Sequence, residues 1–105
     1  MMEKIPTKDD DKKFTEQLRQ MAAQAKSELG YNANRFLEML AQHGGFATAH
    51  ILLGKTEPSE GFTNMHLEGR VDLTMECLVQ RNEWRDFFSP NEIKKAQSLT
   101  GVGKC

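Results

Sequence analysis

The chain has 105 residues, of which 38% are apolar and 28% are charged. This length favours a single domain, and the composition is too apolar for a disordered chain and too charged for a membrane protein. Fourteen basic and fifteen acidic side chains give a net charge of −1, which excludes binding driven by a large overall positive charge. A local basic patch remains compatible with this balance.

The sequence predicts a cytoplasmic protein without a membrane segment. No apolar run approaches the ~20 residues that a membrane-spanning helix needs, and the N-terminus has no apolar stretch of signal-peptide length. The two cysteines are Cys77, within an apolar helical pattern, and Cys105, the last residue. In a cytoplasmic protein we do not expect a disulfide between them, and Cys77 is interpreted as a small buried hydrophobe.

Residues 1–10 are polar and predict a flexible leader before the domain. Apolar side chains then recur at helical spacing from Phe14 to Leu29, which predicts a long amphipathic helix that Gly30 ends. The three adjacent aspartates at positions 9–11 lack the alternating spacing of a calcium loop. They are interpreted as residues of the helix start, facing the positive end of the helix dipole.

Two short helices are expected next, arranged as a hairpin. Asn32 predicts the N-cap of the first, and the adjacent glycines Gly44 and Gly45 break it. The second runs from Phe46 to Leu53 and stops at Gly54. Small alanines in this second helix would allow it to pack closely against a neighbour.

The following segments predict further short helices. One is expected from Ser59 to Glu68, and Asp72 is expected to cap another that carries Cys77. A turn near residue 82 should then place three aromatic side chains inward, namely Trp84, Phe87 and Phe88.

The last helix has the clearest start signal in the chain. Ser89-Pro90-Asn91-Glu92 has the pattern of a capping box with proline in the first turn, and Phe88 and Ile93 complete a hydrophobic staple. Thr100-Gly101 should end this helix. Because no run alternates with period two, we predict an all-α fold: a compact single domain over residues 11–100 with five to seven helices, the first long and the rest short, followed by a frayed tail at 101–105.

No pattern of catalytic or metal-ligating residues is recognised. The histidines at 43, 50 and 66 and the two cysteines lack the close, regular spacing of a zinc site. Gly101-Val102-Gly103-Lys104 lacks the first glycine, the following serine or threonine and the preceding strand of a phosphate-binding loop. We therefore expect neither a metal nor a cofactor, and no catalytic residue is assigned.

Arg70 is the strongest single candidate for a binding residue. It lies between a glycine turn and Asp72, and its guanidinium could bridge Asp72, Glu76 or a helix end. The favoured interpretation is an arginine that fixes the angle between two helices. The alternative is an anchor for a partner carboxylate or a nucleic-acid phosphate.

A second set of candidates is basic and lies near the C-terminus: Arg81, Arg85, Lys94 and Lys95. These residues could form a modest basic face for nucleic acid, but interleaved acidic residues make an ordinary solvated surface the simpler interpretation.

A helix–turn–helix around Gly44-Gly45 is disfavoured because the expected second helix offers only Thr48 and His50 to bases or phosphates.

A family resemblance covers about two thirds of the chain, from Leu29 to about Ala96. The residues that carry it are Gly30-Tyr31-Asn32, Arg35-Phe36-Leu37, Gly44-Gly45, Ala49, Leu52-Leu53, Pro58-Ser59-Glu60-Gly61-Phe62-Thr63, Glu68-Gly69-Arg70-Val71-Asp72-Leu73-Thr74, Glu76, Trp84, Phe88, Glu92 and Ile93. In these the chain resembles an uncharacterised small all-helical bacterial domain family. That family is found alone or as a C-terminal module of larger proteins, some resembling restriction or defence systems, and the resemblance implies no activity, cofactor or catalytic residue.

Three functional hypotheses follow. The leading one is a non-enzymatic protein-interaction module, accessory to a prokaryotic system such as a defence system, because six methionines suit an adaptable contact surface. The second is a weak nucleic-acid-binding domain that uses the basic residues near the C-terminus. The third is an enzyme with a polar site around Arg70, Asp72 and Glu76, which would require perturbed ionisation in a cleft.

Overall fold

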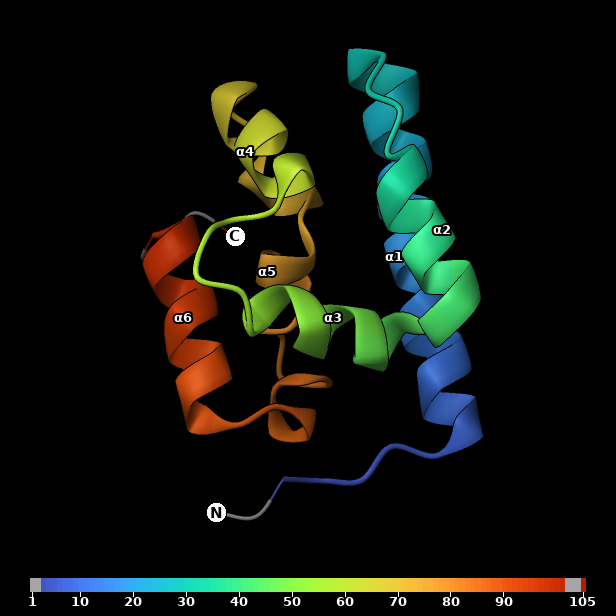
Figure 1. Cartoon of the computed structure of the whole chain (residues 1–105), viewed down its shortest axis with the longest axis vertical. Helices are drawn as coiled ribbons and strands as arrows, with labels where there is room; N and C mark the ends of the chain where they lie inside the picture. The colour runs from blue at the N-terminus through green and yellow to red at the C-terminus, as the bar shows by residue number, and fades with distance from the viewer. Residues whose placement is uncertain (1–2, 102–104) are drawn as a thin grey trace.

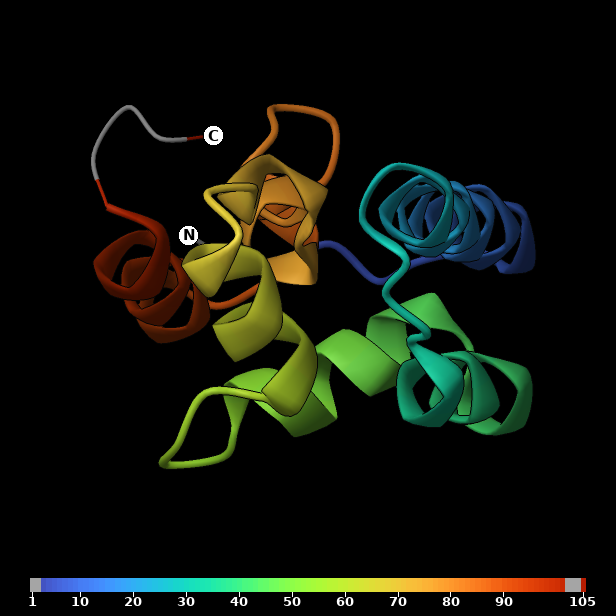
Figure 2. The same cartoon turned by 90° about the horizontal axis from the view of Figure 1, so that it is seen from above.

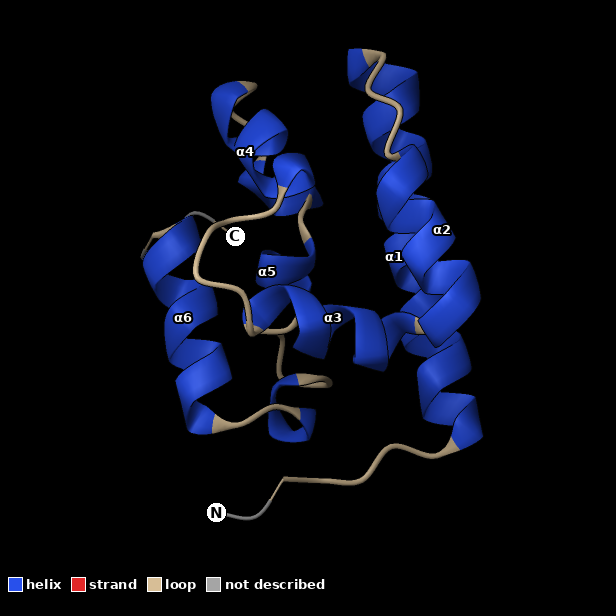
Figure 3. Ribbon diagram, viewed as in Figure 1, coloured by secondary structure: helices blue, strands red, loops and turns tan. Residues whose placement is uncertain are grey.

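The computed structural model describes residues 3–101 and 105, and within these residues the regular structure is entirely helical (Figures 1 and 3). The elements are α1 (Lys8–Leu29), α2 (Asn34–His43), α3 (Gly45–Leu53), α4 (Glu60–Leu67), α5 (Met75–Leu78) and α6 (Pro90–Thr100), with 3₁₀ turns η1 (Val71–Leu73) and η2 (Arg85–Phe87). This confirms the predicted all-α fold with a long first helix and shorter helices after it.

The first helix begins earlier than the sequence predicts. α1 starts at Lys8, so the last three residues of the expected leader are helical. Thr7 caps the helix: its hydroxyl accepts from the Asp10 amide at 3.1 Å, and the Asp10 carboxylate accepts from the Thr7 amide at 2.9 Å. This capping box is hard to recognise in the sequence because Asp stands where Glu or Gln is usual. Gly30, with φ of 69°, ends α1 as predicted.

The N-terminus of α3 lies directly against the side of α1. The Gly45 amide donates to the Thr15 hydroxyl at 2.7 Å, and the Phe46 amide donates to the Asp11 carboxylate at 3.1 Å. Asp11 therefore serves the start of α3 as well as that of its own helix. A Cβ on Gly45 would lie 2.7 Å from a ring carbon of Phe14, so only glycine permits this approach.

The core forms where α3 crosses the molecule. α3 contacts α1 and α2 on one side and α5 and α6 on the other, and Figures 1 and 2 show it bridging these two pairs of helices. The Phe14 and Phe46 rings stack with centroids 4.4 Å apart, and Trp84 meets Phe14 edge-on at 5.1 Å. Trp84, Phe87 and Phe88 are all buried, as the sequence predicts.

Two of the predicted helix caps are wrong by one or two residues. Ala33, not Asn32, is the N-cap of α2, and it supplies no side-chain hydrogen bond. α5 is capped by the Thr74 hydroxyl, which accepts from the Cys77 amide at 3.2 Å, because Asp72 lies within η1 and pairs with Arg70 instead.

The predicted capping box of α6 is confirmed. The Glu92 amide donates to the Ser89 hydroxyl at 3.1 Å, and the Ser89 amide donates to the Glu92 carboxylate at 2.9 Å. Phe88 and Ile93, the predicted staple, are both buried. The helix ends at Thr100, also as predicted.

The expectation about the cysteines is wrong. Cys77 and Cys105 form a disulfide, with Cα atoms 5.4 Å apart and a sequence separation of 28. The packing of α6 against α5 returns the chain end to Cys77, a proximity that sequence spacing does not reveal. Cys77 is buried, as expected. Cys105 is held by the disulfide rather than part of a free tail. Residues 102–104 of the expected tail lie outside the described residues.

Replacing Gly45 by alanine tests the contact between α1 and α3. We expect Gly45→Ala to lower the free energy of unfolding by about 1–3 kcal/mol, the usual result of overpacking, because the new methyl would meet Phe14 and the Thr15 backbone. Urea unfolding followed by circular dichroism measures this. The control is Gly61→Ala in α4, where the nearest atom is Tyr31 Oη at 3.9 Å and alanine should stabilise the helix. Equal stability of Gly45→Ala and the wild type would contradict the contact.

Reduction of the disulfide tests the tether at the C-terminus. A cross-link that closes a loop of 28 residues is expected to contribute about 3–4 kcal/mol by restricting the unfolded chain. Dithiothreitol should lower the stability of the wild type by that amount and leave a Cys105→Ala variant unchanged. A wild type that is insensitive to reductant, or that reacts with a thiol reagent before reduction, would show that the bond is absent.

Candidate binding cleft

Two adjoining cavities form a cleft between the α1–α2 pair and α4. The inner cavity has a volume of about 50 Å³ and is walled by α1, α4 and the segment from Leu73 to Glu76. The outer cavity has a volume of about 270 Å³ and lies along the start of α2. The residues that line both are Tyr31, Ala33, Phe36, Leu52, Ser59 and Gly61. We call the two cavities together the binding cleft.

The walls of the binding cleft are rich in methionine. Met21, Met65 and Met75 line the inner cavity, and Met39 lines the outer one. These are all the methionines among the described residues, although they come from four different elements. Methionine is flexible and polarisable, so a wall of this kind can adapt its shape to an apolar ligand.

Arg70 helps to fix the position of η1, whose Leu73 lines the inner cavity. Its Nε and Nη2 donate to the two oxygens of Asp72 at 3.0 and 3.1 Å, and its Nη1 donates to Glu28 of α1 at 2.7 Å. These hydrogen bonds hold the pKa of both carboxyls below their usual values and raise the pKa of Arg70. The arrangement connects η1 to the C-terminal end of α1, which is the geometry expected of an arginine that holds two elements together.

Glu76 lies apart from this ion pair. It is 4% exposed on α5 and lines the inner cavity. Burial raises the pKa of its carboxyl to about 7, against smaller opposing effects of its own backbone amide and the positive charge of Lys95. Of the three residues that the sequence groups as a polar site, Arg70 and Asp72 therefore face each other at the surface while Glu76 lines the cleft.

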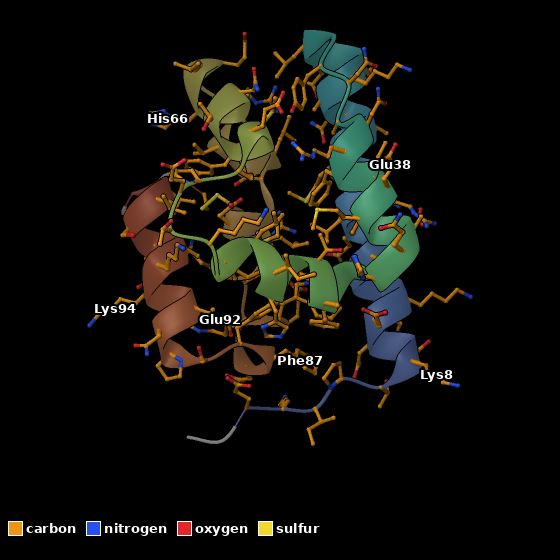
Figure 4. All side chains as sticks on the ribbon, in the orientation of Figure 1. Lys8, Glu38, His66, Phe87, Glu92 and Lys94 are labelled. Atoms are coloured by element: carbon orange, nitrogen blue, oxygen red, sulfur yellow. A yellow bond between two sulfur atoms is a disulfide. The ribbon has the colours of Figure 1, made fainter. Side chains whose placement is uncertain are left out.

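The basic residues near the C-terminus do not all line one cavity. Arg85 and Lys94 line a groove of about 450 Å³ together with Lys4, but Glu3 and Asp86 line it too. Arg81 lines a separate cavity next to the disulfide, and Lys95 is the residue whose charge acts on Glu76. Figure 4 shows Lys94 pointing outward from α6, and Glu92 pointing inward.

His50 has a structural contact that sequence spacing does not reveal. Its Nδ1 lies 2.5 Å from the Glu92 carboxylate, and its ring packs against Phe88 with centroids 4.8 Å apart. This pair joins α3 to the start of α6. It uses the same Glu92 that completes the capping box, which places His50 in a structural role.

Sequence reasoning missed the cleft itself. The methionines suggested an adaptable contact surface, but no spacing in the sequence shows that they converge with Tyr31 on one cleft. The resemblance did include several of the lining residues, namely Tyr31, Phe36, Leu52, Ser59, Gly61 and Phe62.

Comparison with known proteins adds no relative. No protein-family model, curated protein or solved structure matches the chain. Within residues 3–101 and 105, no cluster of three or more metal-ligating side chains occurs, and no helix has the length and apolar character needed to cross a membrane.

The environment of Glu76 predicts a specific pH dependence. A folded-state pKa of about 7, against 4.5 for the free side chain, means that the folded protein binds more protons between these values. Stability should therefore decrease as pH rises from about 4.5 to 7, by about 3 kcal/mol in total. Glu76→Gln removes this cost and should be more stable than the wild type at pH 8 by up to that amount.

Urea unfolding of both proteins at pH 8 and pH 4.5 measures the difference. The advantage of Glu76→Gln should nearly vanish at pH 4.5, where the wild-type carboxyl is protonated in the folded state. Glu60→Gln, on the exposed first turn of α4, is the matched control and should lack this pH-dependent gain. A Glu76→Gln advantage that is constant with pH would show that the carboxyl is not buried.

Proposed function

We propose that the protein is a non-enzymatic interaction module that binds an apolar segment of a partner protein in the binding cleft. The observation that carries the proposal is the convergence of Met21, Met39, Met65 and Met75 on one cleft. Grooves lined by methionine are suited to apolar side chains presented by a partner helix or strand. The resemblance to a bacterial domain family supports a role accessory to a larger prokaryotic system.

The charge around the cleft indicates what kind of segment it would accept. The residues that line the two cavities include two acidic side chains, Glu60 and Glu76, and one basic side chain, Arg35. A partner segment that combines apolar residues with positive charge would complement this surface. The cleft is therefore proposed to take a basic, amphipathic segment.

The proposal includes the cytoplasmic location that the sequence predicts. Disulfides are rare in that compartment, so the Cys77–Cys105 pair would be mostly reduced there. Neither cysteine is among the residues lining the binding cleft. The proposed binding therefore does not require the disulfide.

A nucleic-acid-binding function is the second candidate. It is favoured by the groove that brings Lys4, Arg85 and Lys94 together. Glu3 and Asp86 in the same groove offset much of this charge, and Lys4 lies 4.0 Å from Asp86.

Filling the cleft tests the proposed function. Ala33 is half-buried and lines both cavities, so Ala33→Trp should block them. Ala47→Trp is the matched control, because Ala47 is exposed on α3. Each immobilised protein is incubated with lysate, with and without nuclease treatment, and bound proteins are quantified by mass spectrometry. We expect a partner that binds the wild type and the control, with capture by Ala33→Trp reduced about tenfold, corresponding to about 1.4 kcal/mol.

The same experiment distinguishes the alternatives, once circular dichroism shows that both variants are folded. Equal capture by all three proteins would exclude the cleft as the contact surface. Partners that disappear on nuclease treatment would favour nucleic-acid binding. That outcome would also require affinity to fall steeply with salt and with Arg85→Ala or Lys94→Ala.

A further inference from the structure

Glu76 has a distinctive place in the binding cleft. Among the described residues that line the inner cavity it is the one with a charged side chain, and apolar side chains such as Leu18, Phe62 and Met65 line the same cavity. A carboxylate in such surroundings has lost most of its hydration. A group that restores its interactions would therefore bind there with an advantage that the apolar walls alone do not give.

Within the part of the chain that the structure describes, the charged groups on neighbouring elements leave this carboxylate without a close counter-ion. Asp72 of η1 is paired with Arg70, and His50 of α3 is paired with Glu92. The positive charge of Lys95 on α6 lowers the pKa of Glu76. These two residues are, however, not among the ion pairs that lie within 4.0 Å in the described part of the chain. Tyr31, which lines the same cavity, has its pKa raised and stays neutral.

The size of the inner cavity limits what can reach Glu76. A volume of about 50 Å³ holds the end of one side chain, whereas the outer cavity of about 270 Å³ holds larger groups. A lysine side chain has an apolar stem that suits walls of leucine, methionine and phenylalanine, and a compact ammonium at its tip. Its positive charge also complements Glu60 and Glu76, the acidic residues that line the two cavities, which outnumber the one basic residue there, Arg35.

We propose that the inner cavity is a subsite for an alkylammonium group, and that its occupant is a lysine side chain of the partner segment paired with Glu76. This inference rests on the proposed function, because the rest of that segment would occupy the outer cavity. The ammonium pairs with the ionised carboxyl. Binding should therefore strengthen as pH rises through about 7, while the lysine remains protonated.

Small probes of matched shape test the subsite. n-Pentylamine carries the stem and charge of lysine, and 1-pentanol carries a similar stem without charge. Each is titrated into the full chain, and dissociation constants are measured from NMR shifts of the methionine methyl groups. At pH 8 the amine should bind about tenfold more tightly than the alcohol, a usual advantage of a hydrogen bond between charged groups. This preference should disappear in Glu76→Gln and, for the wild type, at pH 5.5.

The outcomes separate this inference from the proposed function. If the alcohol binds as tightly as the amine at pH 8, or if the preference survives in Glu76→Gln, the apolar cleft stands and the ammonium subsite is excluded. If neither probe shifts the methionine signals, both proposals fail. A third probe, Nα-acetyl-lysine N-methylamide, should also bind in preference to its Nε-acetylated form. If only free pentylamine binds, the site takes a small amine and not a protein lysine.

Discussion

The N-terminus of α3 packs against the side of α1, and the arrangement of the other helices depends on this contact. Thr15 and Asp11 accept the hydrogen bonds of the Gly45 and Phe46 amides, which a helix start leaves without intrahelical partners. The negative charge of Asp11 also suits the positive end of the α3 dipole. Glycine at position 45 makes the approach possible, and Phe46 is thereby brought onto the ring of Phe14.

The same contact explains why a cleft exists. α3 meets the N-terminal half of α1 and then extends toward α5 and α6, so the C-terminal half of α1 is left to face α4. Arg70, next to η1, donates a hydrogen bond to Glu28 of α1 and so connects η1 to this half of α1. Between these two attachments, the side chains of α1, α2 and α4 do not fill the space completely, and the methionines line what remains.

Glu76 places stability and binding in opposition. A buried carboxyl with a raised pKa weakens the folded state at neutral pH and above. Leucine or glutamine at this position would remove that cost. A carboxylate held in an apolar cavity is, however, the arrangement that gives a positively charged ligand its largest advantage over a neutral one. The proposed lysine subsite gives this destabilising residue a function.

The sequence by itself determined the helices and many of their ends. Apolar spacing predicted α1, and Ser89 with Glu92 predicted the start of α6, because these signals act between residues a few positions apart. It also identified Arg70 as a residue that joins elements, although not its partner Glu28. Local patterns placed the cap of α2 one residue early and gave the cap of α5 to Asp72 rather than Thr74.

Only the tertiary structure decided which distant residues meet. Asp11 reaches Phe46 across 35 positions, and Cys77 reaches Cys105 across 28. The four methionines of the cleft and Glu76 converge from separate helices in the same way. Such meetings are set by the crossing of packed helices, which depends on the whole core, whereas caps and helical periodicity depend on neighbours within one or two turns. The fold class could therefore be predicted from the sequence, but the binding cleft could not.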